Sequence, residues 1–170
     1  MGNEVYVSDQ PFLHVSRIEM PLEIRTYVLQ LLQQTLVGTL DLRSHVKQAA
    51  WNVKGPDFAL LQTLFGTLAT ALDAYADLLA ERIAVLGGVA RGTARAVALH
   101  SPLPEYPSDL VVGLAHVQAL AERVAAYVTT LRGAMTHTVE VEEVGTAALY
   151  TDIARGMETR LGGLEAYLQG

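Results

Sequence analysis

Apolar residues recur at steps of three and four positions along most of the 170-residue chain, and this is the period of an amphipathic helix. The stripes predict four long helices, at about residues 21–53, 58–86, 109–137 and 144–167. Pro21 suits a first helical turn, and Gly55 with Pro56 closes the first helix. No segment keeps a period of two over several residues, so no strand is expected.

The connections between these helices carry start signals of their own. Asp57 is placed to cap the second helix, and Ser108 or Asp109 to cap the third. The long connection between those two helices contains Thr93, which would cap a short helix reaching Val97. The pattern therefore predicts an all-α four-helix bundle with a short helix in one long crossover, and the ferritin-like arrangement is a bundle of this kind.

Length and composition indicate one well-packed domain. Hydrophobic residues make up 51 % of the chain and charged residues 18 %, which excludes a disordered or collagen-like protein. We divide the chain into an N-terminal arm, residues 1–20, and a bundle domain, residues 21–170. Helices of about 30 residues span about 45 Å, and many apolar side chains lie outside a single core stripe. A homo-oligomer is therefore expected.

Charge and residue types limit the chemistry. The net charge of −6 argues against binding to nucleic acid. Because the chain has no cysteine, any metal must be held by His, Asp or Glu. The N-terminus lacks the basic and apolar regions of a secretory signal, and no apolar run is long enough for a membrane span. We therefore expect a cytoplasmic protein with no membrane partner.

Two strings of residues point to a known family. Residues 47–58 read KQAAWNVKGPDF, and residues 77–88 read DLLAERIAVLGG. At this separation they closely resemble the Dps mini-ferritins. The resemblance implies a subunit of which twelve assemble into a hollow shell. Such a shell takes up Fe(II), oxidises it with hydrogen peroxide or oxygen, and stores the ferric mineral as a protection against oxidative stress.

The resemblance also implies an oxidation site shared across a two-fold interface. The family pattern has one His before the Trp of the first string, then a His and an Asp early in the second helix. The partner subunit adds an Asp and a Glu four residues apart. In this chain Asp77 and Glu81 match the two carboxylates, but Ala50, Gln62 and Gly66 stand where the other three ligands belong. The usual ferroxidase site, an oxidoreductase centre acting on metal ions, is thus incomplete, and whether the protein is an enzyme stays open.

Lys47 leaves three interpretations of this region open. It lies three residues before Ala50, on the same face of the first helix, where it could pair with Glu81 of the partner subunit. The site would then be a salt bridge in place of a metal centre. Alternatively, histidines from elsewhere rebuild a metal site, or Asp77 and Glu81 bind a cation weakly by themselves. Asp73 extends the acidic stripe by one turn, so the carboxylates could also be plain surface acids.

A rebuilt site for iron, zinc or another divalent metal needs imidazoles. The candidates for this role are the five histidines of the chain, His14, His45, His100, His116 and His137, of which we take His14, His45 and His116 as the metal ligands. His45 points about 140° away from position 50 on the helix, and Asp41 one turn earlier could orient it. His116 is equally explained as a packing residue, whereas His14 could reach a neighbouring subunit from the N-terminal arm.

The resemblance also implies roles for an acidic loop and for the single tryptophan. Glu140, Glu142 and Glu143 fall in the loop before the last helix, where the family places the acids of a cation channel; the alternative is a solvated loop. Trp51 keeps the family position beside the oxidation site, where its ring would intercept radicals or pack in an interface. DNA binding, the family's second activity, usually depends on a Lys-rich tail and is not expected here.

The sequence thus predicts a Dps-like shell for iron storage and detoxification, with oxidation that is weak or uses a non-standard site. A non-catalytic structural subunit that co-assembles with an active paralogue is the main alternative. A smaller oligomer that binds a ligand at its dimer interface is a third.

Overall fold

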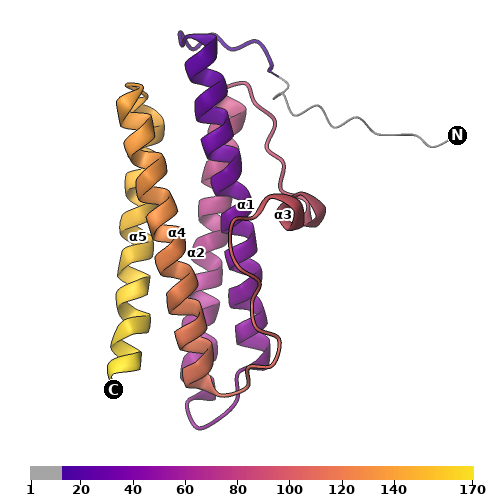
Figure 1. Cartoon of the computed structure of the whole chain (residues 1–170), viewed down its shortest axis with the longest axis vertical. Coiled ribbons are helices and arrows are strands. Elements are labelled where there is room, and N and C mark those ends of the chain that lie inside the picture. Colours follow the sequence, from indigo (N-terminus) through magenta and orange to yellow (C-terminus); the bar gives the residue numbers. More distant parts are fainter. Residues whose placement is uncertain (1–12) are drawn as a thin grey trace, which may run out of the picture.

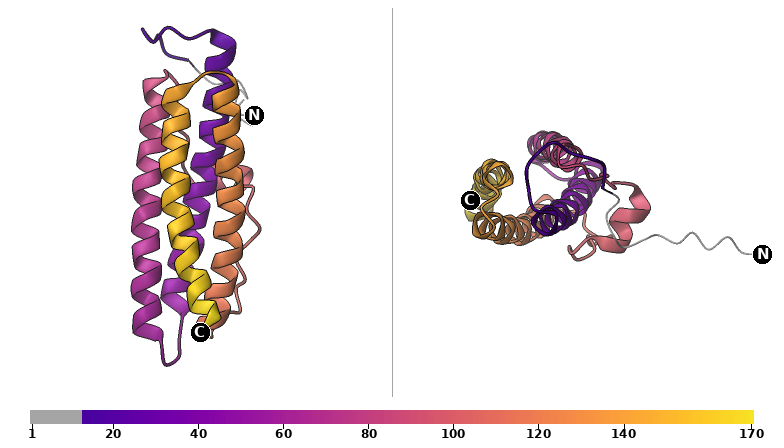
Figure 2. Two further views of the ribbon diagram at one scale, coloured as in Figure 1. Left: turned by 90° about the vertical axis from the view of Figure 1, so that its left-hand side faces the viewer. Right: turned by 90° about the horizontal axis from the view of Figure 1, so that it is seen from above.

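The computed structural model describes residues 13–170, and in this part of the chain the regular elements are all helices. They are α1 (Leu22–Asn52), α2 (Phe58–Val85), α3 (Ala94–His100), α4 (Gly113–Glu140) and α5 (Val144–Gln169). The four long helices run side by side, and α3 lies outside them in the crossover (Figure 1, Figure 2). The predicted all-α four-helix bundle with a short helix in the crossover is confirmed.

Both predicted boundaries of the third long helix are wrong. The third long helix begins at Gly113 rather than at Ser108 or Asp109. The backbone amide of Lys54 donates to the carbonyl of Val111 at 3.1 Å, which holds the chain before α4 extended against the loop after α1. The same helix continues to Glu140, three residues beyond the predicted end at His137.

Two predicted caps have different outcomes. Thr93 caps α3, since its hydroxyl accepts from the amide of Ala96 at 3.3 Å, although α3 reaches His100 instead of Val97. Asp57 precedes α2 but makes no capping hydrogen bond. Its carboxylate accepts from the hydroxyl of Tyr167 at 2.7 Å and so ties the start of α2 to the end of α5.

The core is filled by apolar side chains from all four long helices. The largest fully buried ones include Leu32, Leu42, Leu61, Phe65, Leu72, Leu79, Leu120 and Leu131. Two buried tyrosines each have a partner on α1: Tyr127 lies 2.6 Å from the hydroxyl of Thr39, and Tyr150 lies 3.1 Å from that of Thr35. Burial raises the pKa of both phenols, so they stay neutral hydrogen-bonding groups.

The described part of the N-terminal arm lies against its own chain. The amide of His14 donates to the carbonyl of Gly87 at 2.7 Å, just after α2. A Cβ atom at Gly87 would come within 2.7 Å of the His14 carbonyl oxygen, so this contact needs glycine. Residues 1–12 lie outside the described residues. None of the helices in residues 13–170 combines the length and the apolar character needed to cross a membrane.

Candidate metal-binding face

Three acidic residues follow one another along the exposed side of α2. Asp73, Asp77 and Glu81 are spaced by four residues, which places them on one face of the helix. Asp73 is engaged in an ion pair, whereas the carboxylates of Asp77 and Glu81 make no ion pair or hydrogen bond with the described chain. These two are therefore the carboxylates available to a cation.

The neighbouring face of α1 carries two positive charges. Arg43 Nε lies 2.7 Å from Asp73 Oδ1, and the ammonium of Lys47 lies 5.8 Å from the ring centre of Trp51, whose side chain is 71 % exposed. Surface pairs of this kind contribute little to stability. The effect of the Arg43–Asp73 pair on a bound metal is larger, because a neutralised Asp73 weakens the attraction of this face for a divalent cation.

The three positions that lack the family's ligands differ in their surroundings. Ala50 is buried with 7 % exposure, while Gln62 is exposed. Gly66 is half-buried, and a Cβ atom built on it would meet no other atom within 4 Å. Ala50 and Gly66 offer no donor atom to a metal, and the amide oxygen of Gln62 is a weak ligand for iron. Within residues 13–170 no three His, Cys, Asp or Glu side chains gather in a way that could hold a metal ion.

His45 and His116, two of the predicted metal ligands, are buried under the crossover instead. Tyr106 lies between them, with ring centres 5.5 Å from His45 and 6.1 Å from His116, and we call these three residues the histidine–tyrosine cluster. The Tyr106 hydroxyl and His116 Nδ1 are 2.7 Å apart, and His45 Nε2 is 3.4 Å from Asp41 Oδ1. Asp41 contacts His45, but both belong to a packed region that fastens the crossover to α1 and α4.

Burial keeps both histidines neutral. Burial is the main cause of the lowered pKa of His45; the charge of Arg123 lowers this pKa further, and the charge of Asp41 raises it. Burial is also the main cause of the lowered pKa of His116. Burial also raises the pKa of Tyr106 to about 12, although Arg123 lies over its ring at 5.2 Å. Within residues 13–170, the second ring nitrogens, His45 Nδ1 and His116 Nε2, are buried without a hydrogen-bond partner of good geometry. The backbone of Leu110 acts on the His116 ring and opposes the lowering of its pKa.

Acidification should therefore weaken the fold through this cluster. In the unfolded chain the histidines titrate near pKa 6.5, whereas in the folded chain the pKa is lower, so the unfolded state binds more protons as the pH falls through 6.5. The urea midpoint at fixed protein concentration should be lower at pH 5.5 than at pH 7.5. The double variant His45→Gln, His116→Gln should narrow that difference, and His137→Gln should leave it unchanged. An equal or higher midpoint at pH 5.5 would show that the cluster does not act in this way.

The predicted channel acids have separate roles. Glu140 belongs to α4 rather than to the loop and lies 3.2 Å from His137, while Glu142 is exposed with a positive φ of 59°. Glu143 is buried with 8 % exposure: one oxygen pairs with Arg82 at 2.8 Å, and the other accepts from the amide of Thr146 at 2.7 Å. The carboxylate of Glu143 is thus used inside the subunit, and only Glu140 and Glu142 are left for a channel.

Comparison with known proteins places this chain in a family. The chain matches the ferritin-like domain family over residues 29–170. It is 34 % identical over 156 residues to a DNA protection during starvation protein of Agrobacterium fabrum, covering 92 % of this chain and 96 % of that protein. The chain belongs to the Dps mini-ferritin family.

Solved Dps structures agree with this membership. DpsA14 from Streptomyces coelicolor has a TM-score of 0.88 and 26 % identity over 94 % of both chains. Mycobacterium smegmatis Dps has a TM-score of 0.87 and 25 % identity over 92 % of this chain and 94 % of that one. The resemblance seen in the two sequence strings is therefore confirmed as a family relationship over most of the chain.

Sequence reasoning missed Arg43 and Tyr106 on this Dps subunit. Arg43 could have been found, because it precedes Lys47 by one helical turn and continues the same face toward Asp73. Tyr106 gave no local signal, since its place between His45 and His116 depends on how the crossover folds back over α1 and α4.

Proposed function

We propose that this Dps-family protein assembles into a hollow shell that binds and stores iron, and that it oxidises Fe(II) slowly. The observation that carries this proposal is the pair of carboxylates, Asp77 and Glu81, which stand at the two family positions that remain and make no ion pair or hydrogen bond within residues 13–170. Ala50 and Gly66, which lack a donor atom, stand at two of the other three positions. Fe(II) is the substrate and the ferric mineral is the cargo.

The chemistry explains why the remaining ligands support binding better than oxidation. Hydrogen peroxide takes up two electrons and two protons to give two water molecules, and each Fe(II) supplies one electron. A fast reaction therefore needs two iron ions held next to each other. The oxygens of Asp77 and Glu81 suit a hard, largely hydrated cation. Within residues 13–170 no imidazole joins them in a metal-binding group, and two carboxylates alone cannot fix two irons in one geometry.

The surroundings favour a partly salt-bridged site over a rebuilt one. Arg43 and Lys47 bring positive charge to the neighbouring face, and Arg43 already occupies Asp73. His45 and His116 are committed to the histidine–tyrosine cluster. A contribution from His14 of a neighbouring subunit remains a prediction, as do the shell of twelve chains, the cytoplasmic location, zinc as an alternative metal and the absence of DNA binding.

Iron loading tests the proposal. Fe(II) is added anaerobically, peroxide or air follows, and the iron that elutes with the protein is measured by size-exclusion chromatography. We expect ferric iron to elute with a particle of about twelve 18.3-kDa chains. The variant Asp77→Asn, Glu81→Gln should load more slowly, whereas Asp152→Asn, Glu165→Gln, which removes two exposed acids from α5, should load like the original protein.

The other outcomes identify the alternatives. A twelve-chain particle that retains no iron would favour a structural subunit that co-assembles with an active paralogue. The missing ligands at positions 50 and 66 support this alternative. A much smaller particle would favour an oligomer that binds a ligand at its dimer interface.

A further inference from the structure

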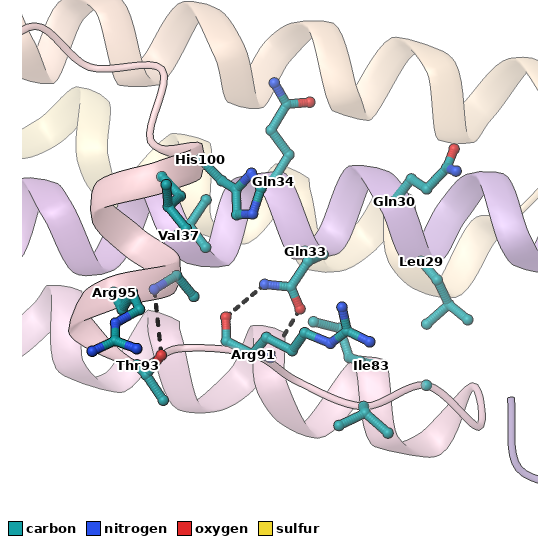
Figure 3. Close-up of a pocket in the computed structure, with 14 residues that line it drawn as sticks. Leu29, Gln30, Gln33, Gln34, Val37, Ile83, Arg91, Thr93, Arg95 and His100 are labelled. Atoms are coloured by element: carbon teal, nitrogen blue, oxygen red, sulfur yellow. Dashed lines mark hydrogen bonds between the residues drawn. The ribbon is translucent and has the colours of Figure 1, made fainter. Parts of the chain in front are cut away.

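A groove of about 530 Å³ lies between α1, the linker that follows α2, and α3 (Figure 3). Its volume falls within the range of about 300–1,000 Å³ that is common for small-molecule sites. The inner surface is apolar and includes Leu29, Val37 and Ile83. Val89 and Leu99 are also part of the lining, and they are 45 % and 72 % exposed. The groove therefore offers apolar surface to a ligand.

The linker on one side of the groove is held firmly in place. The side-chain amide of Gln33 donates to the carbonyl of Arg91 at 2.6 Å, and its oxygen accepts from the amide of Arg91 at 2.9 Å. Two residues further on, Thr93 caps α3. The main chain of Arg91 is thus fixed to α1, which leaves its side chain available, and a site formed in this way loses little entropy when a ligand binds.

The charge of the groove contrasts with that of the protein. Arg91, Arg95 and His100 line it and no acidic residue does, although the whole chain has a net charge of −6. Other arginines, such as Arg43 and Arg82, are held in ion pairs. The guanidinium groups of Arg91 and Arg95 have no hydrogen bond or ion pair within residues 13–170. Positive charge without a partner beside apolar surface is complementary to a molecule that carries both an anion and an apolar body.

The two arginines lie at different ends of the groove (Figure 3). The side chain of Arg91 runs below Gln33 with its guanidinium turned toward Ile83, whereas Arg95 lies at the other end beside Thr93. A carboxylate at Arg91 would accept two parallel hydrogen bonds from the guanidinium. The apolar body of the same molecule would then extend over Val37 toward Leu99.

We propose that this groove binds a small amphipathic carboxylate, with the anionic head at Arg91 and the apolar body between α1 and α3. This activity is separate from iron binding, because Asp77 and Glu81 do not line the groove. Decanoate is the probe, and decanol, which has the same chain without the charge, is its control.

Titration calorimetry of the assembled protein tests the proposal. We expect saturable binding of one decanoate per chain and binding of decanol that is about tenfold weaker. Arg91→Gln should weaken decanoate binding about tenfold, because the charged contact is lost. The fold should survive, since Gln33 bonds only to the main chain of Arg91. Arg95→Gln should weaken binding less, and Arg155→Gln, an exposed arginine on α5, should leave it unchanged.

Three results would overturn the proposal. The first is an absence of saturable heat with decanoate. The second is equal binding of decanoate and decanol, or of decanoate to Arg91→Gln and Arg155→Gln. The third is a smaller particle mass for Arg91→Gln together with no decanoate binding to the original protein, since a second copy of the chain would then fill the groove.

Discussion

The triple substitution Ala50→His, Gln62→His, Gly66→Asp should raise the rate of peroxide-driven Fe(II) oxidation by at least about 100-fold. It supplies the three ligands that this subunit lacks, and even the outer-shell partners of metal ligands are worth roughly 10–100-fold in affinity or activity. Stopped-flow absorbance of the ferric product, at fixed iron and peroxide, measures the rate.

The structure accommodates most of this change. Gly66 has open space around its Cβ position, and aspartate costs a helix interior about 0.3 kcal/mol less than glycine does, so the change is tolerated. Gln62 is exposed, whereas Ala50 is buried, so an imidazole at position 50 must displace the side chains packed around it.

A second variant is the matched control for this experiment. Adding Asp77→Asn and Glu81→Gln to the triple variant should remove the gain, because the new ligands need the carboxylates to complete the site. If the triple variant keeps its particle size but stays as slow as the original protein, the missing ligands are not what limits oxidation. If the original protein is already as fast, the proposed slow oxidation is wrong.

The largest effect on stability is expected for Glu143→Ala. This change leaves Arg82, which is 22 % exposed, without its carboxylate, and it removes the acceptor of the hydrogen bond that the amide of Thr146 donates to Glu143 at the start of α5. Breaking a buried ion pair typically costs about 3–5 kcal/mol, and the lost cap adds about 1 kcal/mol. Because Arg82 is partly exposed, we expect a total of about 3 kcal/mol.

The thermal midpoint at fixed protein concentration measures this loss. Glu142→Gln is the control, since its side chain is exposed and should change the stability by less than about 0.5 kcal/mol. Gly145 also indicates that Arg82 packs closely over the start of α5, because a Cβ atom at position 145 would lie 2.6 Å from Arg82 Nη2. A midpoint for Glu143→Ala that matches the control would mean that the ion pair does not hold α5 to α2.

Most of the fold could be predicted because its signals are local. Apolar stripes gave the four long helices, and Thr93 gave the start of α3. The start of α4 could not be predicted from Ser108 or Asp109, because the bond between Lys54 and Val111 joins segments that are far apart in the sequence. Asp57 has the right residue type for a cap, but its carboxylate accepts a hydrogen bond from Tyr167, which lies 110 residues later in the sequence.

In the candidate site, too, local features could be predicted from the sequence and contacts between distant residues could not. The absence of donors at Ala50 and Gly66 could be seen in the sequence alone. The burial of Glu143 could not, because its partner Arg82 lies on α2, 61 residues earlier. The fate of His45 and His116 depends on Tyr106, which only the path of the crossover brings between them.

Anomalous diffraction at the iron edge, from crystals soaked anaerobically in Fe(II), tests the central claim most directly. We predict a partly occupied iron peak beside the carboxylates of Asp77 and Glu81, with no imidazole nitrogen within a bonding distance of about 2.1 Å. A fully occupied pair of iron peaks with histidine ligands, including His14 of a neighbouring subunit, would contradict the claim that only the carboxylate half of the site remains.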